Sequence, residues 1–234
     1  MAKNIVITGA TGDIAQEIVK LLPDDQLILV SRSLEGLEQL YGGLSNVILL
    51  TNDQIFTDES ILTDLSVDIL INNAGFGVFK RLSELSDGEI MEQFSVNTFF
   101  PIQLIRQLKP RVQVVNIASV AGKLPTAKST VYAASKAALI AFSDALRMEN
   151  SDLIVTTVNT GPVTTKFHKN NADYLKKVGK NAISAEVVAD RIVSTLGKNK
   201  RELNLPWQLA VVAKLRTIFP KAIDLLSVKF LNYK

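Results

Sequence analysis

Short apolar runs alternate with amphipathic stretches along most of the chain. The first run, NIVIT at residues 4–8, predicts a buried strand, and Ala15, Ile18, Val19 and Leu22 follow it at helical spacing. Six further strands are expected at residues 26–33, 46–53, 67–75, 112–118, 153–165 and 201–206. Strands that alternate with helices in this way predict an α/β fold, with an open, doubly wound parallel sheet and helices on both faces.

The stretches between the strands predict the helices. They are expected at residues 34–41, 87–108, 132–148 and 184–196, the last of them capped by Ser184. Residues 164–183 form a polar, lysine-rich stretch, which we interpret as a loop and short helix that act as a lid. No repeat or linker divides the chain, so residues 1–234 are expected to form a single domain, with residues 207–234 as a C-terminal helical extension.

Composition narrows the chemistry that the chain can carry. The 234 residues are 47% hydrophobic and 21% charged, which suits one domain with a substantial core. There is no cysteine and one histidine, His168, so a thiolate or histidine-rich metal site is excluded and a histidine-based triad is disfavoured. The opening MAKNIVITGA reads as a strand rather than a signal peptide, and no run approaches the ~20 apolar residues of a membrane span. We therefore expect a soluble, cytoplasmic protein.

Positive charge is concentrated at the C-terminal end. The formal net charge is +3. Residues 207–234 carry +4, from Lys214, Arg216, Lys221, Lys229 and Lys234 against Asp224, so the rest of the chain carries −1. These basic residues belong to no recognised nucleic-acid motif, so we do not expect a nucleic-acid partner.

One pair of residues suits proton transfer. Tyr132 and Lys136 stand four apart in a stretch of strong helix formers, so their side chains share one helix face. The reference pKa of a phenol is about 10, and a neighbouring cation favours the phenolate. Ser119 ends an apolar run and could donate a hydrogen bond to a substrate carbonyl. Taken alone, the Tyr–Lys spacing also fits an ordinary packed tyrosine beside a solvated lysine.

The first strand leads into a candidate phosphate-binding loop. Gly9, Gly12 and Ala15 are three residues apart between this strand and the helix that follows, an arrangement that forms an anion cradle. The second strand ends at Ser31 and Arg32 with no acid nearby, which favours a ribose 2′-phosphate, and so NADP over NAD. A solvated loop arginine is the alternative. Asn52 or Asp53 is placed to meet the adenine edge.

Together these motifs resemble the short-chain dehydrogenase/reductase family. The resemblance runs from about residue 4 to residue 206 and consists of six elements in the family's order: TGATG at 8–12, NNAG at 72–75, Asn97, Ser119, Tyr132 with Lys136, and TGP at 160–162. It implies a Rossmann-type sheet of seven strands in the order 3-2-1-4-5-6-7 and a nicotinamide cofactor.

The resemblance also implies the roles of individual residues. Asn97, Ser119, Tyr132 and Lys136 match the catalytic tetrad: Tyr132 exchanges the proton, Ser119 holds the substrate oxygen, Lys136 binds the nicotinamide ribose, and Asn97 holds a water. The residues expected to contact the cofactor are Gly9, Thr11, Gly12, Asp13, Ile14, Ser31, Arg32, Asn52, Asp53, Asn73, Ala74, Gly75, Tyr132, Lys136, Gly161, Val163 and Thr165.

Two positions depart from the family's main branch. Asp13 lies where that branch has its second glycine, and Thr160 replaces a proline. The resemblance implies an NADPH-dependent reductase of carbonyl compounds, reversible as an alcohol dehydrogenase. A ketoacyl-thioester reductase is the alternative within the family, and a non-catalytic NADP-binding regulator is the alternative of another class.

The tail and the oligomeric state are the remaining expectations. Ala222, Ile223, Leu226, Phe230 and Tyr233 share one helix face. The favoured interpretation packs this tail over the substrate cleft or on a dimer partner, and packing on the body would also bury Trp207 and Phe219; a basic amphipathic contact with anionic membranes is the other interpretation. We expect a homodimer, paired through the apolar helices that carry Asn97 and Tyr132.

Overall fold

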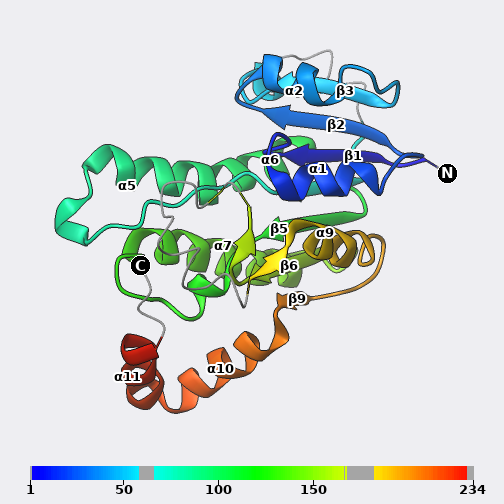
Figure 1. Ribbon diagram of the computed structural model, residues 1–234. Helices are drawn as coiled ribbons and strands as arrows, with labels where there is room; N and C mark the ends of the chain where they lie inside the picture. Colours follow the sequence, from blue (N-terminus) through cyan, green and yellow to red (C-terminus); the bar gives the residue numbers. More distant parts are fainter. Residues whose placement is uncertain (1, 58–65, 166, 168–181, 231–234) are drawn as a thin grey trace.

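A parallel β-sheet forms the centre of the molecule in the computed structural model, which describes residues 2–57, 66–165, 167 and 182–230 (Figure 1). Its strands are β1 (Asn4–Thr8), β2 (Gln26–Ser31), β3 (Val47–Thr51), β4 (Ile69–Asn72), β5 (Gln113–Ile117), β6 (Ile154–Thr160) and β9 (Glu202–Leu205). They are ordered β3-β2-β1-β4-β5-β6-β9, and every pair is parallel. The predicted seven-stranded, doubly wound order is confirmed, with β9 as the seventh strand.

Helices cover both faces of the sheet. Their bounds are α1 (Asp13–Lys20), α2 (Leu34–Tyr41), α3 (Gln54–Thr57), α5 (Asp87–Phe94), α6 (Phe100–Leu108), α7 (Thr130–Glu149), α9 (Ala185–Val193), α10 (Trp207–Ile218) and α11 (Pro220–Phe230). Because side chains alternate along a strand, Ile5 and Ile7 enter the core under α1, α2 and α9, whereas Val6 enters the core shared with α3, α6 and α7.

The helix expected at residues 87–108 contains a local irregularity. It begins with a capping box between Ser86 and Glu89, and its α-helical pattern is replaced by a π-helical turn, η2 (Ser95–Phe99), before α6. Asn97 lies in this turn and is fully buried. Single π-turns inside helices occur often at functional sites.

The strand expected at residues 153–165 ends earlier than predicted. β6 stops at Thr160, and a separate two-stranded sheet pairs β7 (Val163–Thr164) with β8 (Ile183–Ser184). Pro162 accounts for the break: the Gly161 N–H still donates to the Leu205 carbonyl of β9 at 2.6 Å, but proline has no N–H with which to continue the ladder. Most of the predicted lid, residues 166 and 168–181, lies outside the described residues.

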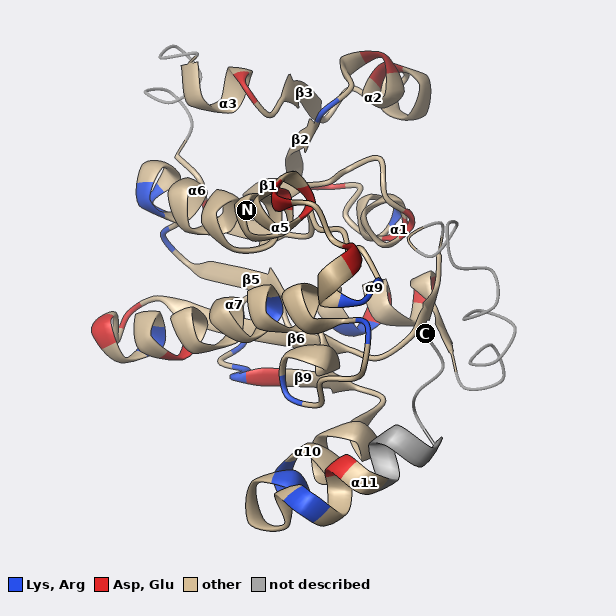
Figure 2. Ribbon diagram, turned by 90° about the vertical axis from the view of Figure 1, so that its left-hand side faces the viewer, with Lys and Arg blue, Asp and Glu red and all other residues tan. Residues whose placement is uncertain are grey.

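The C-terminal extension forms two helices, α10 and α11, that project from the sheet and its covering helices (Figure 1, Figure 2). An ion pair between Arg216 and Asp224 (Nε to Oδ1, 2.6 Å) joins the two helices. Trp207 and Phe219 are 66% and 59% exposed. The expectation that the body buries these two residues is therefore wrong, because only the inner side of α10 reaches it. Tyr233 lies outside the described residues, and no described helix is long and apolar enough to span a bilayer.

Candidate active site

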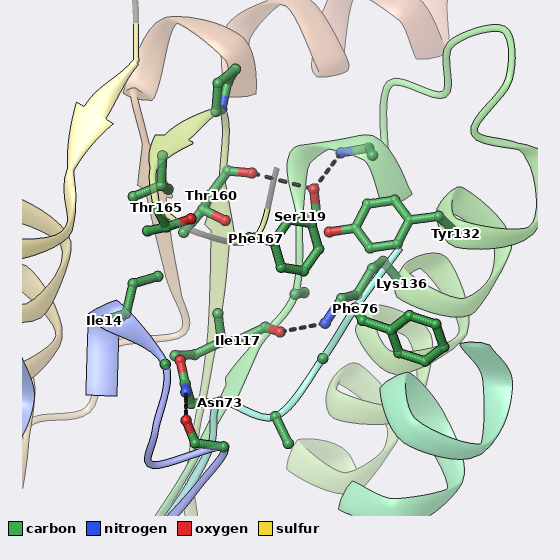
Figure 3. A pocket seen from close by; sticks show the side chains of 18 of the residues that line it. Ile14, Asn73, Phe76, Ile117, Ser119, Tyr132, Lys136, Thr160, Thr165 and Phe167 are labelled. Carbon is green, nitrogen blue, oxygen red and sulfur yellow. Dashed lines mark hydrogen bonds between the residues drawn. The ribbon is translucent and has the colours of Figure 1, made fainter. Parts of the chain in front are cut away.

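A cavity of about 850 Å³ lies beyond the carboxyl ends of the central strands (Figure 3). Ligands of doubly wound sheets bind at this edge, where the strand order reverses. Seventeen of the predicted site residues line the cavity: Gly9, Thr11, Gly12, Asp13, Ile14, Ser31, Arg32, Asn52, Asn73, Ala74, Gly75, Ser119, Tyr132, Lys136, Gly161, Val163 and Thr165. Among the predicted residues, Asp53 and Asn97 do not line it.

The glycine loop after β1 is held in a conformation that requires glycine. Gly9 has a φ of +61°, and a Cβ there would approach the Ala74 Cα to 2.8 Å. The Gly12 N–H donates to the Gly9 carbonyl at 2.9 Å, which closes the turn. At Gly9 no side chain covers the backbone of this loop on the side that faces the cavity, and a bound pyrophosphate requires such close approach to the backbone.

The loop after β4 is fastened to the glycine loop. The Asn73 amide Nδ2 donates to the carbonyls of Thr8 and Gly9, each at 3.1 Å. In return the Thr8 hydroxyl accepts the backbone N–H groups of Asn73 (3.1 Å) and Ala74 (3.0 Å). Asn73 therefore joins the two loops, and Thr8 is a partner that the sequence did not indicate.

The amino end of α1 faces the cavity. Gly12 is its N-cap and has no side chain to accept a hydrogen bond from the first turn, so N–H groups of that turn are available to an anion. Asp13 occupies the first turn and lines the cavity. Behind the loop, the Tyr41 hydroxyl donates to the Ala10 carbonyl at 2.6 Å. Burial and the charge of Glu17 raise the pKa of Tyr41 to about 12, so this hydrogen bond persists across the working pH range.

The ends of β2 and β3 form the side of the cavity expected to hold the adenosine half of a dinucleotide. The Ser31 and Thr11 hydroxyls lie 3.2 Å apart, and the Asn52 N–H donates to the Ser31 carbonyl at 3.0 Å. Arg32 is exposed and has no ion-pair partner among the described residues. The Asp53 carbonyl instead accepts backbone hydrogen bonds at the start of α3, and Asp53 does not line the cavity, so the structure favours Asn52 of the two.

Tyr132 and Lys136 lie on α7, one turn apart, and both line the cavity. The Lys136 ammonium is buried, with a residue exposure of 4%, and donates to the Ile117 carbonyl at 2.9 Å. Burial lowers the pKa of Lys136 to about 8, because no described carboxylate offsets the lost hydration. A lysine whose pKa lies this close to neutral pH can act as a cation and can also release or accept a proton.

Ser119 lies at the end of β5, and its hydroxyl points into the same part of the cavity as the Tyr132 phenol (Figure 3). The hydroxyl accepts the Ala121 N–H at 3.1 Å and donates to the Thr160 carbonyl at 3.3 Å. The long donor bond to Thr160 is the weaker of the two. Ser119 can therefore redirect its proton to a substrate oxygen without losing the contact that orients it.

Asn97 lies one layer behind the cavity. Its Oδ1 accepts the Phe76 N–H at 3.0 Å, and its Nδ2 donates to the Phe76 carbonyl at 2.8 Å and to the Ser135 hydroxyl at 3.0 Å. A Cβ on Gly75 would lie 3.1 Å from both the Asn97 Oδ1 and the Lys136 Nζ. Asn97 thus fixes the loop after β4 against α7, next to the lysine.

The sequence and the fold agree with known proteins over most of the chain. The family model for short chain dehydrogenase matches residues 3–175. The chain belongs to the short-chain dehydrogenase/reductase family. It is an oxidoreductase of that family, and its glycine loop, its loop after β4 and its Ser–Tyr–Lys group are the parts that line the cavity.

Two curated relatives are similar in sequence to this short-chain dehydrogenase/reductase. The Uncharacterized oxidoreductase YbbO of Escherichia coli is 30% identical over 244 residues, which cover 92% of this chain and 91% of YbbO. The Ketoacyl reductase HetN of Nostoc is 34% identical over 180 residues, which cover 69% of this chain and 62% of HetN.

Solved structures of the family have the same fold. An alcohol dehydrogenase from Thermococcus sibiricus, complexed with 5-hydroxy-NADP, superposes with a TM-score of 0.77 at 24% identity, over 87% of this chain and 96% of that one. A family member from Burkholderia phymatum in complex with NAD reaches 0.83 at 18% identity, over 94% and 95%. At these identities the likeness shows the fold alone.

The apolar part of the cavity was missed from the sequence. Phe79 packs edge-on against the Tyr132 ring with centroids 5.3 Å apart, and the Phe167 ring lies 6.1 Å from it. Leu124 and Leu209 also line the cavity. These residues come from four separate loops and helices, so no spacing in the sequence could have grouped them.

Proposed function

We propose that this protein reduces a carbonyl compound to an alcohol with NADPH and catalyses the reverse reaction with NADP⁺. The observation that carries the proposal is that Ser119, Tyr132 and Lys136 line the same cavity as the glycine loop. The bare backbone at Gly9 and the amino end of α1 fit the pyrophosphate of such a cofactor. When bound, the nicotinamide ring supplies or accepts the hydride.

The protein's own groups handle the proton and the developing charge. The Tyr132 hydroxyl donates its proton to the carbonyl oxygen, and takes it back from the alcohol in the reverse direction. Ser119 donates a hydrogen bond to the same oxygen, which gains negative charge as the reaction proceeds, so the bond strengthens in the transition state. The charge of Lys136 favours the phenolate, and Asn97 holds the loop beside Lys136 in place.

NADP is favoured over NAD by the residues at the end of β2. Arg32 is exposed beside the cavity and has no described ion-pair partner, so its guanidinium is available to a 2′-phosphate. No acid occupies the neighbouring positions Ser31 and Ser33, where a carboxylate would repel that phosphate.

The substrate is proposed to carry an apolar group next to its carbonyl. Phe79 and Phe167 lie against Tyr132 and line the cavity together with Leu124 and Leu209, and burial of apolar surface favours binding there by about 25 cal/mol per Å². The similarity to HetN, whose name is ketoacyl reductase, favours a ketoacyl thioester as a second candidate substrate.

The test is to assay the purified protein with NADPH against aldehydes, ketones and ketoacyl thioesters, alongside the Tyr132→Phe variant. Loss of the proton donor should lower turnover at least about 100-fold, while NADPH binding measured by calorimetry stays within a few-fold.

Tyr41→Phe is the matched control, because it removes a buried phenol that does not line the cavity. It should lose about 1 kcal/mol of stability, and because it acts only on the glycine loop, through the Ala10 carbonyl, it should retain turnover at saturating NADPH. A Tyr132→Phe enzyme with near wild-type turnover would refute the mechanism, and a wild type inactive on every substrate class would favour the non-catalytic regulator.

A further inference from the structure

The outer side of α10 presents a continuous apolar surface. Trp207, Val211, Leu215 and Ile218 are spaced four, four and three residues apart, so they lie on one face of the helix. Their exposures are 66%, 45%, 42% and 66%. We call these four residues the tail stripe. Single exposed apolar residues are ordinary on a protein surface. A row of four along one helix instead indicates a surface that binds an apolar partner.

Two further exposed apolar residues follow the tail stripe in the chain, one at the turn after α10 and one in α11. Phe219 and Leu225 are 59% and 71% exposed. The ion pair between Arg216 and Asp224 fixes the second helix against the first, so the two helices form a single unit.

Uncompensated positive charge borders the same surface. Between residues 207 and 225 the basic residues are Lys214, Arg216 and Lys221, and the one acid is Asp224. Arg216 is paired with that acid, whereas Lys214 and Lys221 are exposed and have no ion-pair partner among the described residues. Figure 2 shows basic residues gathered where α10 meets α11. The surface therefore matches a partner that is apolar and anionic at once.

We propose that α10 and α11 dock on an anionic lipid bilayer, with the tail stripe inserted at the level of the head groups. α10 has 12 residues, too few to cross a bilayer, and it projects from the body so that it can reach a flat surface. Apolar side chains that enter the interface while lysines contact lipid phosphates are typical of helices that lie in the membrane plane. A tryptophan at one end of the stripe suits the same boundary.

A second copy of the chain fits this surface less well. If α10 and α11 of two copies packed face to face, their lysines without ion-pair partners would come together, and like charges in contact disfavour association. Docking on lipid also places the wall of the cavity near the bilayer, because Gln208 and Leu209 on α10 line that cavity while the tail stripe faces outward.

The single tryptophan of the chain makes the proposal testable on the unmodified protein. Trp207 is the only tryptophan, so its fluorescence reports on the stripe alone. Vesicles of phosphatidylcholine with phosphatidylglycerol should shift its emission to the blue and sediment the protein, and high salt should weaken both effects. Pure phosphatidylcholine should do neither as strongly. No shift and no sedimentation with anionic vesicles would overturn the proposal, and a blue shift that follows protein concentration without lipid would assign the surface to self-association instead.

Variants separate the apolar and the charged contributions. Trp207→Gln with Ile218→Gln should weaken vesicle binding about tenfold or more, whereas Leu40→Gln with Met148→Gln, which alters exposed apolar residues elsewhere, should leave it unchanged.

Lys214→Gln with Lys221→Gln should weaken vesicle binding about 30-fold, at about fivefold per lysine. The matched control is Lys198→Gln with Lys200→Gln, two exposed lysines outside the tail. Equal losses in test and control pairs would contradict docking through α10. All readouts are independent of turnover, so they stand or fall separately from the proposed reductase activity.

Discussion

Replacing Lys136 with methionine should abolish turnover and at the same time stabilise the folded protein. The Lys136 ammonium is buried with one carbonyl acceptor, and its pKa falls from 10.5 to about 8. At pH 7 both the folded and the unfolded protein hold this proton, so the folded state carries the full cost of the buried charge. A shift of this size corresponds to about 3 kcal/mol.

The net gain is smaller because the substitution also removes a hydrogen bond. The Ile117 carbonyl loses its donor from Lys136, at a cost of about 1 kcal/mol. Methionine fills a similar volume with an unbranched chain, so packing changes little. The expected result at pH 7 is about 2 kcal/mol of added stability, or roughly 4–8 °C in Tm for a protein of this size.

The pH dependence distinguishes this explanation from a change in packing. As the pH rises through about 8 the folded wild type releases the Lys136 proton, whereas the unfolded chain keeps its proton until about 10.5, so wild-type stability rises across that window. The advantage of Lys136→Met should therefore shrink between pH 8 and pH 10. Urea unfolding of both proteins across this range measures it, with Lys198→Met as an exposed control that should show no trend. A constant difference from pH 7 to pH 10, or a less stable variant, would refute the reasoning.

Three further predictions concern the cofactor and the assembly. Arg32→Ala should weaken NADPH binding about ten- to a hundredfold and leave NADH binding unchanged, because one charge-assisted contact contributes about 1.5–3 kcal/mol; calorimetry with both nucleotides measures this, and an unchanged preference would exclude Arg32 as the phosphate ligand. Gly9→Ala should lose binding of both nucleotides, since its Cβ would meet Ala74 at 2.8 Å where φ is +61°, and equal affinities would contradict the cradle. Light scattering at micromolar concentration should show a homodimer, paired through the helices that carry Asn97 and Tyr132, and a monomer would count against it.

The sheet and most of the residues that line the cavity could be predicted because their signals are local. A buried strand between turns and two residues four apart on a helix are both visible in a short window of sequence. The spacing of Tyr132 and Lys136 therefore places them together on one helix face without any information from distant segments. Asn97 needed more than spacing, because the π-turn around it brings its side chain behind the loop that Gly75 occupies.

The remaining features depend on contacts between distant segments. Tyr41 supports the glycine loop from the end of α2, 31 residues along the chain, and nothing in its own helix indicated this. Phe79 and Phe167 come from separate segments of the chain, and both rings lie against the Tyr132 ring. Packing on the body would have buried the apolar stripe of the tail. The spacing of apolar residues shows that a stripe exists, but it does not identify the partner that covers it. In the structure Trp207 is exposed.

The bridge between β7 and β8 makes the intervening segment exchangeable. Val163 pairs with Ile183 and Thr164 with Ser184, and Ser184 caps α9, so both ends of the segment are fixed by contacts outside it. Closing a longer loop between fixed ends costs only about 0.6 kcal/mol for each doubling of its length. A segment of another length could be grafted between Thr164 and Ile183 while the sheet and the Tyr–Lys pair keep their places. Phe167, which lies in this span, lines the cavity beside Tyr132, so such a graft would change that wall of the cavity on a sheet that stays constant.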